Sequence, residues 1–200
     1  MDFSLNFQLL ATGLAMGSIY ALVALGFVLI SNAVNVVNFA QGEFVMVPAF
    51  VAVWVMTTLK LPFPLVYLII LIFMGVFGII FQRLAYYPLR NRSFLPVIIS
   101  TIGVSIFLKN AAQLVFGAEP LLMARPTSAD VLNLAGVFID PQHVVIIVVT
   151  LITLVFQYVF FEKTSLGKKM QATAQDKEMA RLLGVRVSKM IVITFVYSSI

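Results

Sequence analysis

Three long stretches without a charged residue constrain this chain more than any other feature. Residues 3–42, 61–82 and 141–161 contain no Asp, Glu, Lys or Arg. A run of about 18 or more such apolar residues is long enough to cross a bilayer as a helix. The chain is 62% hydrophobic and 10% charged, whereas soluble domains are about a quarter charged. The sequence therefore predicts an all-α, polytopic transmembrane helical bundle.

Six apolar segments are expected to cross the membrane, in one transmembrane domain over residues 1–200. Two segments are short, and Lys60 and Lys109 would cap them where a long basic side chain can reach water. Because the chain stops inside an apolar run, we expect it to be truncated at its C-terminus. The predicted spans are about 7–30, 44–59, 65–82, 94–108, 143–161 and 190–200 onward.

Basic residues indicate how the chain is oriented. Loop 83–92 holds three arginines and no acid, and loop 162–189 holds most of the other basic residues. Cytoplasmic loops carry an excess of Lys and Arg, so both loops are predicted to be cytoplasmic. The stretch 110–142 has Arg125 against Glu119, Asp130 and Asp140 and is predicted to be external, with turns and short elements. The net charge of +5 is therefore a topology signal, and we expect no nucleic-acid partner.

Several kinds of chemistry are excluded by what the sequence lacks. With no cysteine, the chain can form no disulfide, thiolate metal site or cysteine nucleophile. It has one histidine and no GxxxxGK[ST], HExxH or GxSxG motif. We expect no catalytic residue and no metal site, and any ATP chemistry must come from another chain.

The stretch VVNFAQGEFVMVPAF places polar side chains between two apolar segments. Its acid is the only one between Asp2 and Glu119. Amides facing lipid would stay unsatisfied, at several kcal/mol each, so they must face protein, water or a pathway. An acid within a membrane is a candidate functional residue. The candidate pathway or helix-break residues are Asn35, Asn38, Gln41, Gly42 and Glu43.

Two interpretations of this stretch stay open. If it is helical, Asn35, Asn38 and Gly42 share a narrow arc that could line a pathway. In the structural alternative, Glu43 is a charge at a helix N-terminus, where the helix dipole favours it. Gly42 would allow a close backbone approach or a helix break, and Pro48 should kink the following helix.

The stretch LGKKMQATAQDKEMARLLGV, in the second basic loop, has helical periodicity. The spacing i, i+4, i+7, i+11 of Ala172, Asp176, Met179 and Leu183 predicts an amphipathic helix over 172–183, which Gly184 would end. Such a helix can lie on the membrane, pack on its own protein or dock on a partner, and its small residues favour docking. The candidate docking residues are Ala172, Ala174, Asp176, Met179, Ala180, Leu183 and Gly184. In the first span, Gly13 and Gly17 form a GxxxG pair, which predicts close helix packing there.

Three stretches occur together in a familiar order: GSIYALVALGFVLISNAVNVVNFAQGEF, YYPLRNRSFLPVIISTIGVSIFLKN and FFEKTSLGKKMQATAQDKEMARLLGVRVSKMIVITF. They resemble the membrane permeases of branched-chain amino acid ABC importers, above all the smaller, H-type subunit. The resemblance covers essentially the whole chain. Gln41 stands where the family often has His, so no titrating group is expected at that position.

The resemblance implies a permease subunit, not an enzyme, in the inner membrane of a bacterial cell. It also implies partners: a homologous second permease, two ATP-binding subunits that hold ATP and Mg, and an extracytoplasmic substrate-binding protein. The chain would form the translocation pathway for Leu, Ile or Val and couple to the ATPases through 162–189. Alternatives are a urea or amide permease of the same family and an ion-coupled secondary transporter. The latter usually needs ionisable groups within its spans, and only Glu43 qualifies.

Overall fold

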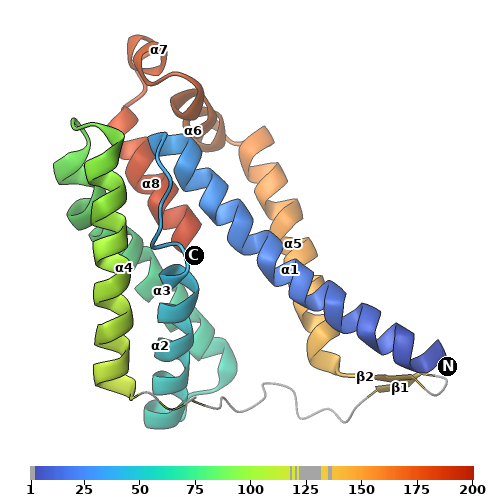
Figure 1. Cartoon of the computed structure of the whole chain (residues 1–200). Helices are drawn as coiled ribbons and strands as arrows, with labels where there is room; N and C mark the ends of the chain where they lie inside the picture. The colour runs from blue at the N-terminus through green and yellow to red at the C-terminus, as the bar shows by residue number, and fades with distance from the viewer. Residues whose placement is uncertain (1–2, 118, 120, 122–131, 135–136) are drawn as a thin grey trace. The chain divides into compact units, whose positions relative to one another are not determined.

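The computed structural model describes residues 3–117, 119, 121, 132–134 and 137–200, and these are largely helical (Figure 1). Helices α1 to α4 precede a short hairpin, and α5 to α8 follow it. The first four helices are α1 (Phe3–Val34), α2 (Glu43–Leu59), α3 (Phe63–Phe81) and α4 (Phe94–Phe116). The others are α5 (Pro141–Lys163), α6 (Ser165–Gln175), α7 (Lys177–Leu182) and α8 (Val187–Ser199).

Four described segments are long and apolar enough to cross a membrane: Asn6–Val34, Phe63–Leu89, Phe94–Phe116 and Pro141–Lys163. Helices α2 and α8 are shorter apolar helices. Little of the surface of the four long segments is buried within the chain, as befits helices whose outer faces meet lipid or other helices. The prediction of an all-α, multi-pass bundle is confirmed.

Helix α4 is longer than the sequence suggested. It was expected to end at 108 with Lys109 as its cap, but it continues through Lys109 to Phe116. The residues NAAQLVF contain no helix breaker, and the helix ends only before Gly117, which has a φ of 85°. Lys60 does end α2, in the left-handed conformation.

The stretch predicted to be external contains a small hairpin. Strand β1 (Leu132–Leu134) pairs antiparallel with β2 (Val137–Ile139), and Asn133 lies opposite Phe138. Arg125 and Asp130, on which the orientation of this stretch was partly based, lie outside the described residues.

The chain packs as two compact units, Met1–Ala24 with Ala124–Lys168 and Leu25–Met123 with Lys169–Ile200. In the second unit α3 packs against α2 and α8, and α2 packs against α4. Figure 1 shows α2, α3 and α4 side by side. These units reflect packing within the chain, and one permease domain over 1–200 stays a prediction.

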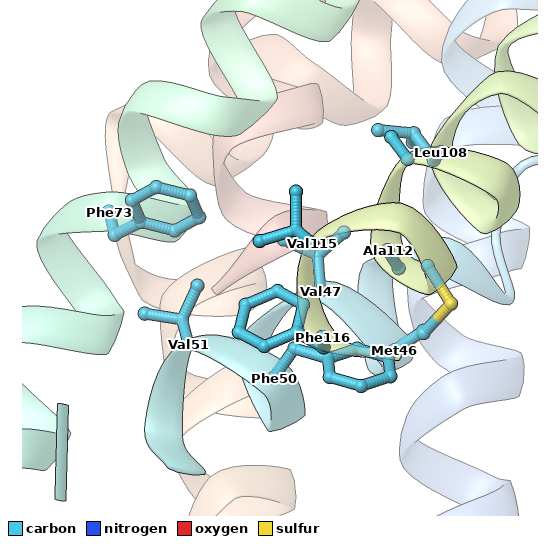
Figure 2. A pocket seen from close by; sticks show the side chains of 10 residues that line it. Met46, Val47, Phe50, Val51, Phe73, Leu108, Ala112, Val115 and Phe116 are labelled. Atoms are coloured by element: carbon cyan, nitrogen blue, oxygen red, sulfur yellow. The ribbon is translucent and has the colours of Figure 1, made fainter. Parts of the chain in front are cut away.

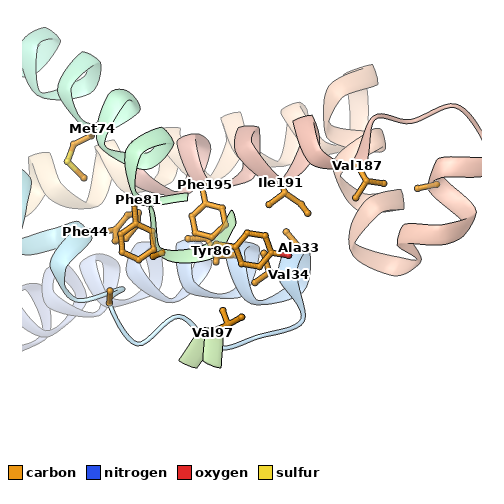
Figure 3. Close-up of a cluster of buried hydrophobic side chains, with 14 residues drawn as sticks. Ala33, Val34, Phe44, Met74, Phe81, Tyr86, Val97, Val187, Ile191 and Phe195 are labelled. Carbon is orange, nitrogen blue, oxygen red and sulfur yellow. The ribbon is translucent and has the colours of Figure 1, made fainter. Parts of the chain in front are cut away.

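An aromatic cluster forms the core of the second unit (Figure 3). The ring of Phe44 meets Phe81 edge to face, with centroids 4.9 Å apart. Phe195 of α8 lies 6.0 Å from Phe81 and 5.8 Å from Tyr86. Such pairs contribute about 0.5–1.5 kcal/mol beyond the area that they bury. The cluster therefore joins the start of α2 to the ends of α3 and α8.

A close helix approach lies at Gly78, where α3 meets α8. A Cβ added there would lie 2.9 Å from the carbonyl oxygen of Phe195. The hydroxyl of Ser199 donates to the carbonyl of Met74 at 2.9 Å across the same contact. By contrast, no described atom lies within 4 Å of a Cβ placed at Gly13 or Gly17. The GxxxG prediction of close packing is thus not seen between described parts of this chain.

Beyond Phe81 the helix changes its winding. Gln82–Tyr86 form a π turn, and a 3₁₀ turn, Tyr87–Leu89, follows. The backbone N–H of Tyr87 bonds to the carbonyl of Gln82, five residues back. A π turn widens the helix locally and redirects the side chains after it.

Candidate functional site

The segment between α1 and α2 is a compact turn rather than a helix. Helix α1 ends at Val34, Asn35 has a φ of 59°, and α2 begins at Glu43. The stretch is therefore a helix break and not a helical arc, and a pathway role for its residues stays a prediction. Asn tolerates the left-handed conformation better than most residues, which explains why α1 can end here.

Asn38 and Gln41 organise the turn from inside. Asn38 Oδ1 accepts a hydrogen bond from the backbone N–H of Ala40 at 3.1 Å. Its Nδ2 donates to Gln41 Oε1 at 3.5 Å, and both side chains are buried. The hydroxyl of Thr101 on α4 accepts the N–H of Phe39 at 3.3 Å. The turn is thus bound both to itself and to α4.

Glu43 is the most buried charge of this site, with 3% of its side chain exposed. The hydroxyl of Ser105 donates to Glu43 Oε1 at 2.6 Å, and Lys109 Nζ lies 3.4 Å from the same oxygen. Stripping water from a carboxylate is unfavourable unless hydrogen bonds and an opposite charge compensate. Helix α4 supplies both.

Sequence reasoning found the acid but missed its partners. Thr101, Ser105 and Lys109 repeat every four residues and so share one face of α4. A polar stripe of this kind in an otherwise apolar span is a detectable signal. It was missed because the span was expected to end before Lys109.

The five candidate residues of this stretch do not act as one set. Asn38, Gln41 and Glu43 are buried together, as described above. Asn35 and Gly42 are exposed, and a Cβ at Gly42 would meet no described atom within 4 Å. No close approach therefore requires glycine at position 42. The glycine that adjoins this site is Gly26 of α1, where a Cβ would lie 3.1 Å from Gln41 Nε2.

Lys109 connects the buried site to the outer surface of the unit. Its side chain is 62% exposed, although it stands within a helix long enough to cross a membrane. A lysine at the lipid-facing centre of a span costs about 2.5–3.5 kcal/mol or more. This face of α4 should therefore meet water or another polypeptide rather than lipid.

An apolar cavity of about 280 Å³ lies one helical turn beyond Glu43 and Ser105 (Figure 2). It is lined by α2, α3 and α4 and is open on one side, and the ring of Phe50 stacks on that of Phe116 with centroids 4.8 Å apart. Ligand cavities typically begin at about 300 Å³, so this one suits a small apolar group. Its lining includes Met46, Phe50, Phe73, Leu108, Ala112 and Phe116.

The second candidate site, the basic loop 162–189, is folded as two short helices. The single helix expected over 172–183 is wrong, because α6 ends at Gln175 and α7 begins at Lys177. Asp176 lies between them with an extended backbone, and its carboxylate accepts the N–H groups of Glu178 at 2.8 Å and Met179 at 3.0 Å. An aspartate stabilises a helix more as an N-cap than in its interior.

The predicted end of this loop helix is confirmed. Gly184 has a φ of 80°, its N–H bonds to the carbonyl of Arg181, and Val185 bonds back to Ala180. This is a Schellman arrangement, in which glycine adopts the left-handed conformation without strain.

The candidate docking residues divide between structural and exposed positions. Ala180 is 2% exposed and belongs to the core of the second unit, and Ala172 and Ala174 are half-buried. Met179 is exposed, as are Leu182 and Leu183, at 81% and 74%. Leu182 was missed by the sequence argument because it lies outside the predicted stripe. Burial, followed by the nearby charge of Arg181, lowers the pKa of Lys177 in this loop.

The sequence profile of the family described as "Branched-chain amino acid transport system / permease component" matches residues 9–200. The chain belongs to this family. The chain is 33% identical to the high-affinity branched-chain amino acid transport system permease protein BraD of Pseudomonas aeruginosa. The match covers 94% of this chain and 66% of that protein. The family resemblance inferred from the three sequence stretches is confirmed.

A second relative is the corresponding permease protein LivH of Escherichia coli, 29% identical over 94% of this chain and 65% of that protein. The probable LivH of Methanocaldococcus jannaschii is 27% identical over 86% of this chain. The chain thus spans about two thirds of the length of the bacterial relatives. No solved structure matches the chain significantly.

Proposed function

We propose that this chain is part of the pathway-forming permease of an ATP-driven importer of branched-chain amino acids. The main support for this proposal is the family match over residues 9–200. The relatives' names specify branched-chain amino acid transport. The proposed location is the inner membrane of a bacterial cell. Substrate, energy source and location are proposals, because the chain spans only about two thirds of those relatives.

The buried site supports a place along a pathway. The Glu43–Lys109 pair sits at the surface of α4 that should not meet lipid, and a wholly apolar cavity lies one turn away. The apolar lining of this cavity suits the hydrocarbon side chain of a branched-chain amino acid better than a polar amide such as urea. This favours amino acids over the urea or amide alternative.

The α6–α7 loop is the proposed coupling element. Its exposed Met179, Leu182 and Leu183 have no covering group among the described residues, whereas Ala180 anchors α7 to the core. Two ATP-binding subunits, which would hold ATP and Mg, are proposed to dock there. The further partners proposed are a homologous second permease and an extracytoplasmic binding protein.

Uptake in cells that express the full-length protein with its partner subunits tests the proposal. Labelled leucine should enter only when ATP is available, and unlabelled isoleucine and valine should compete while urea should not. Uptake that continues after ATP depletion with the proton gradient intact would instead identify an ion-coupled transporter. Competition by urea but not by valine would identify an amide permease.

A further inference from the structure

A second cavity, of about 350 Å³, lies where the π turn after α3 meets the start of α8. It is unlike the cavity beside Glu43, because polar and basic groups line one end and apolar groups the other. Arg83, Tyr87 and Lys189 form the basic and aromatic end together with Gln82 and Ser188, and Val192 and Ile193 form the apolar end.

The two cations of this cavity lack an acidic partner. No carboxylate of the described residues pairs with Arg83 or Lys189. Arg83 and Arg90 instead lie near the ring of Tyr87, with the guanidinium carbons 5.6 and 3.8 Å from its centre. Cation–π contact holds these guanidinium groups in place without neutralising them. An anion could therefore bind here without displacing an existing ion pair.

The π turn presents a further donor. Gln82 lines the cavity, and its side-chain amide makes no hydrogen bond to another described residue. Its polar atoms are not among the fully buried ones that lack a partner, so the amide keeps some exposure. A ligand oxygen in the cavity would complete the bonding of this amide.

The position of the cavity along the helices matches a membrane surface. Arg83 lies 20 residues after Phe63, the first residue of α3, which is about 30 Å of helix and about the thickness of the hydrocarbon core. Ile79, one turn before Arg83, is exposed, and Ile193 lies one turn after Lys189. The basic end therefore faces the headgroup level, and the apolar end faces the acyl chains.

We infer that this cavity binds the phosphate headgroup of an anionic phospholipid, with its acyl chains along α3 and α8. Basic pockets between membrane helices on the cytoplasmic side suit such headgroups, because phosphate oxygens accept from guanidinium, ammonium and amide donors at once. Loop 83–92 and the 162–189 loop, which flank the cavity, carry the basic excess of the cytoplasmic side. The inference depends on the membrane location of the chain and not on what it transports.

Lipid retention by the purified full-length complex tests this site. The complex is equilibrated with vesicles of equal parts phosphatidylcholine and phosphatidylglycerol, repurified, and its bound lipids are measured by mass spectrometry. The wild type should retain phosphatidylglycerol selectively. The double variant Arg83→Gln, Lys189→Gln should retain about 25-fold less, since each basic group near the surface contributes roughly a fivefold factor.

A matched control removes the same charge elsewhere in these loops. The double variant Arg92→Gln, Lys169→Gln should retain phosphatidylglycerol as the wild type does. If the Arg83, Lys189 variant fails to fold, the single variant Lys189→Gln, which changes only an exposed side chain, should still show a several-fold loss. Equal retention by all variants, or equal retention of the two lipids by the wild type, would overturn the inference.

Two further measurements test whether the cavity binds something other than a phospholipid. Millimolar inorganic phosphate should not displace the lipid, because it lacks the acyl chains; complete displacement would make this a free-phosphate site. Loss of the ATPase subunit from the Arg83, Lys189 variant, with lipid retention unchanged, would make it a protein contact. Either result refutes the lipid assignment.

Discussion

At the scale of single residues, Glu43 is the unusual feature. Two hydrogen-bonding or charged partners from α4, Ser105 and Lys109, compensate its burial. Removing one partner of such a set leaves the other buried and uncompensated, which costs more than replacing both. Glu43 and Lys109 should therefore show strong energetic coupling.

A double-mutant cycle measures that coupling. We expect Lys109→Met to destabilise the full-length protein by about 2 kcal/mol, since it leaves a buried carboxylate without its counter-charge. Combining it with Glu43→Gln should recover much of this loss. Thermal unfolding of the detergent-solubilised protein checks it. Additive effects of the two substitutions would contradict a coupled pair.

The same variants address transport. If the charge of Glu43 has only a structural role, Glu43→Gln should leave leucine uptake near the wild-type rate once the amount of protein in the membrane is matched. A pathway role instead predicts a loss of uptake beyond the loss of protein.

At the scale of elements, α3 and α8 can pack closely because Gly78 of α3 has no side chain. Gly78 lets the backbone of α8 approach, and Ser199 then reaches a carbonyl of α3. Close approach through small residues is a principal means of packing helices in membranes, where lipid provides no hydrophobic drive between helices.

Two glycines on α3 provide a matched pair of variants. Gly78→Ala should destabilise the protein by about 1–3 kcal/mol, because the new methyl group meets the backbone of α8. Gly75→Ala should be neutral or slightly stabilising, since its Cβ would meet only side-chain atoms at 3.7 and 3.9 Å and alanine favours helix. Melting temperatures of the two proteins decide this, and equal shifts would contradict the packing described.

At the scale of the whole molecule, the basic loop 162–189 divides its residues between two tasks. Asp176, Ala180 and Gly184 shape α7 and attach it to the core, while Leu182 and Leu183 extend outward. Substitution of Ala180 by a charged residue would disrupt the core, so its effect would not report on docking. The exposed leucines are the informative positions.

The double variant Leu182→Ser, Leu183→Ser should fold normally, because 81% and 74% of these side chains are already exposed. We expect it to lose about tenfold in co-purification of the ATP-binding subunit, and to lose leucine uptake in proportion, because exposed apolar patches mark protein–protein contacts. Leu166→Ser, another exposed leucine of this loop, is the control. Unchanged association in the double variant would rule out these leucines as anchors.

Much of the architecture could be predicted because it follows from local composition. Uncharged runs of bilayer length require helices, since backbone groups in lipid must be satisfied within the segment. Asn38, Gln41 and Glu43 were identified because polar groups in such surroundings need partners. The partners themselves, Thr101 and Ser105, lie about 60 positions away, where local patterns carry no information.

The sequence by itself determined the helical membrane architecture, the family and the basic loops, because hydropathy, charge and motif order are local properties. Only the tertiary structure decided that 35–42 is a turn, that Lys109 neutralises a buried acid and that Ala180 is core rather than surface. It also showed that α3 and α8 meet closely at Gly78, whereas no described atom lies near a Cβ placed at either glycine of the GxxxG pair. Which side chains share a space depends on how helices distant in sequence pack, and the pattern along one helix does not contain that information.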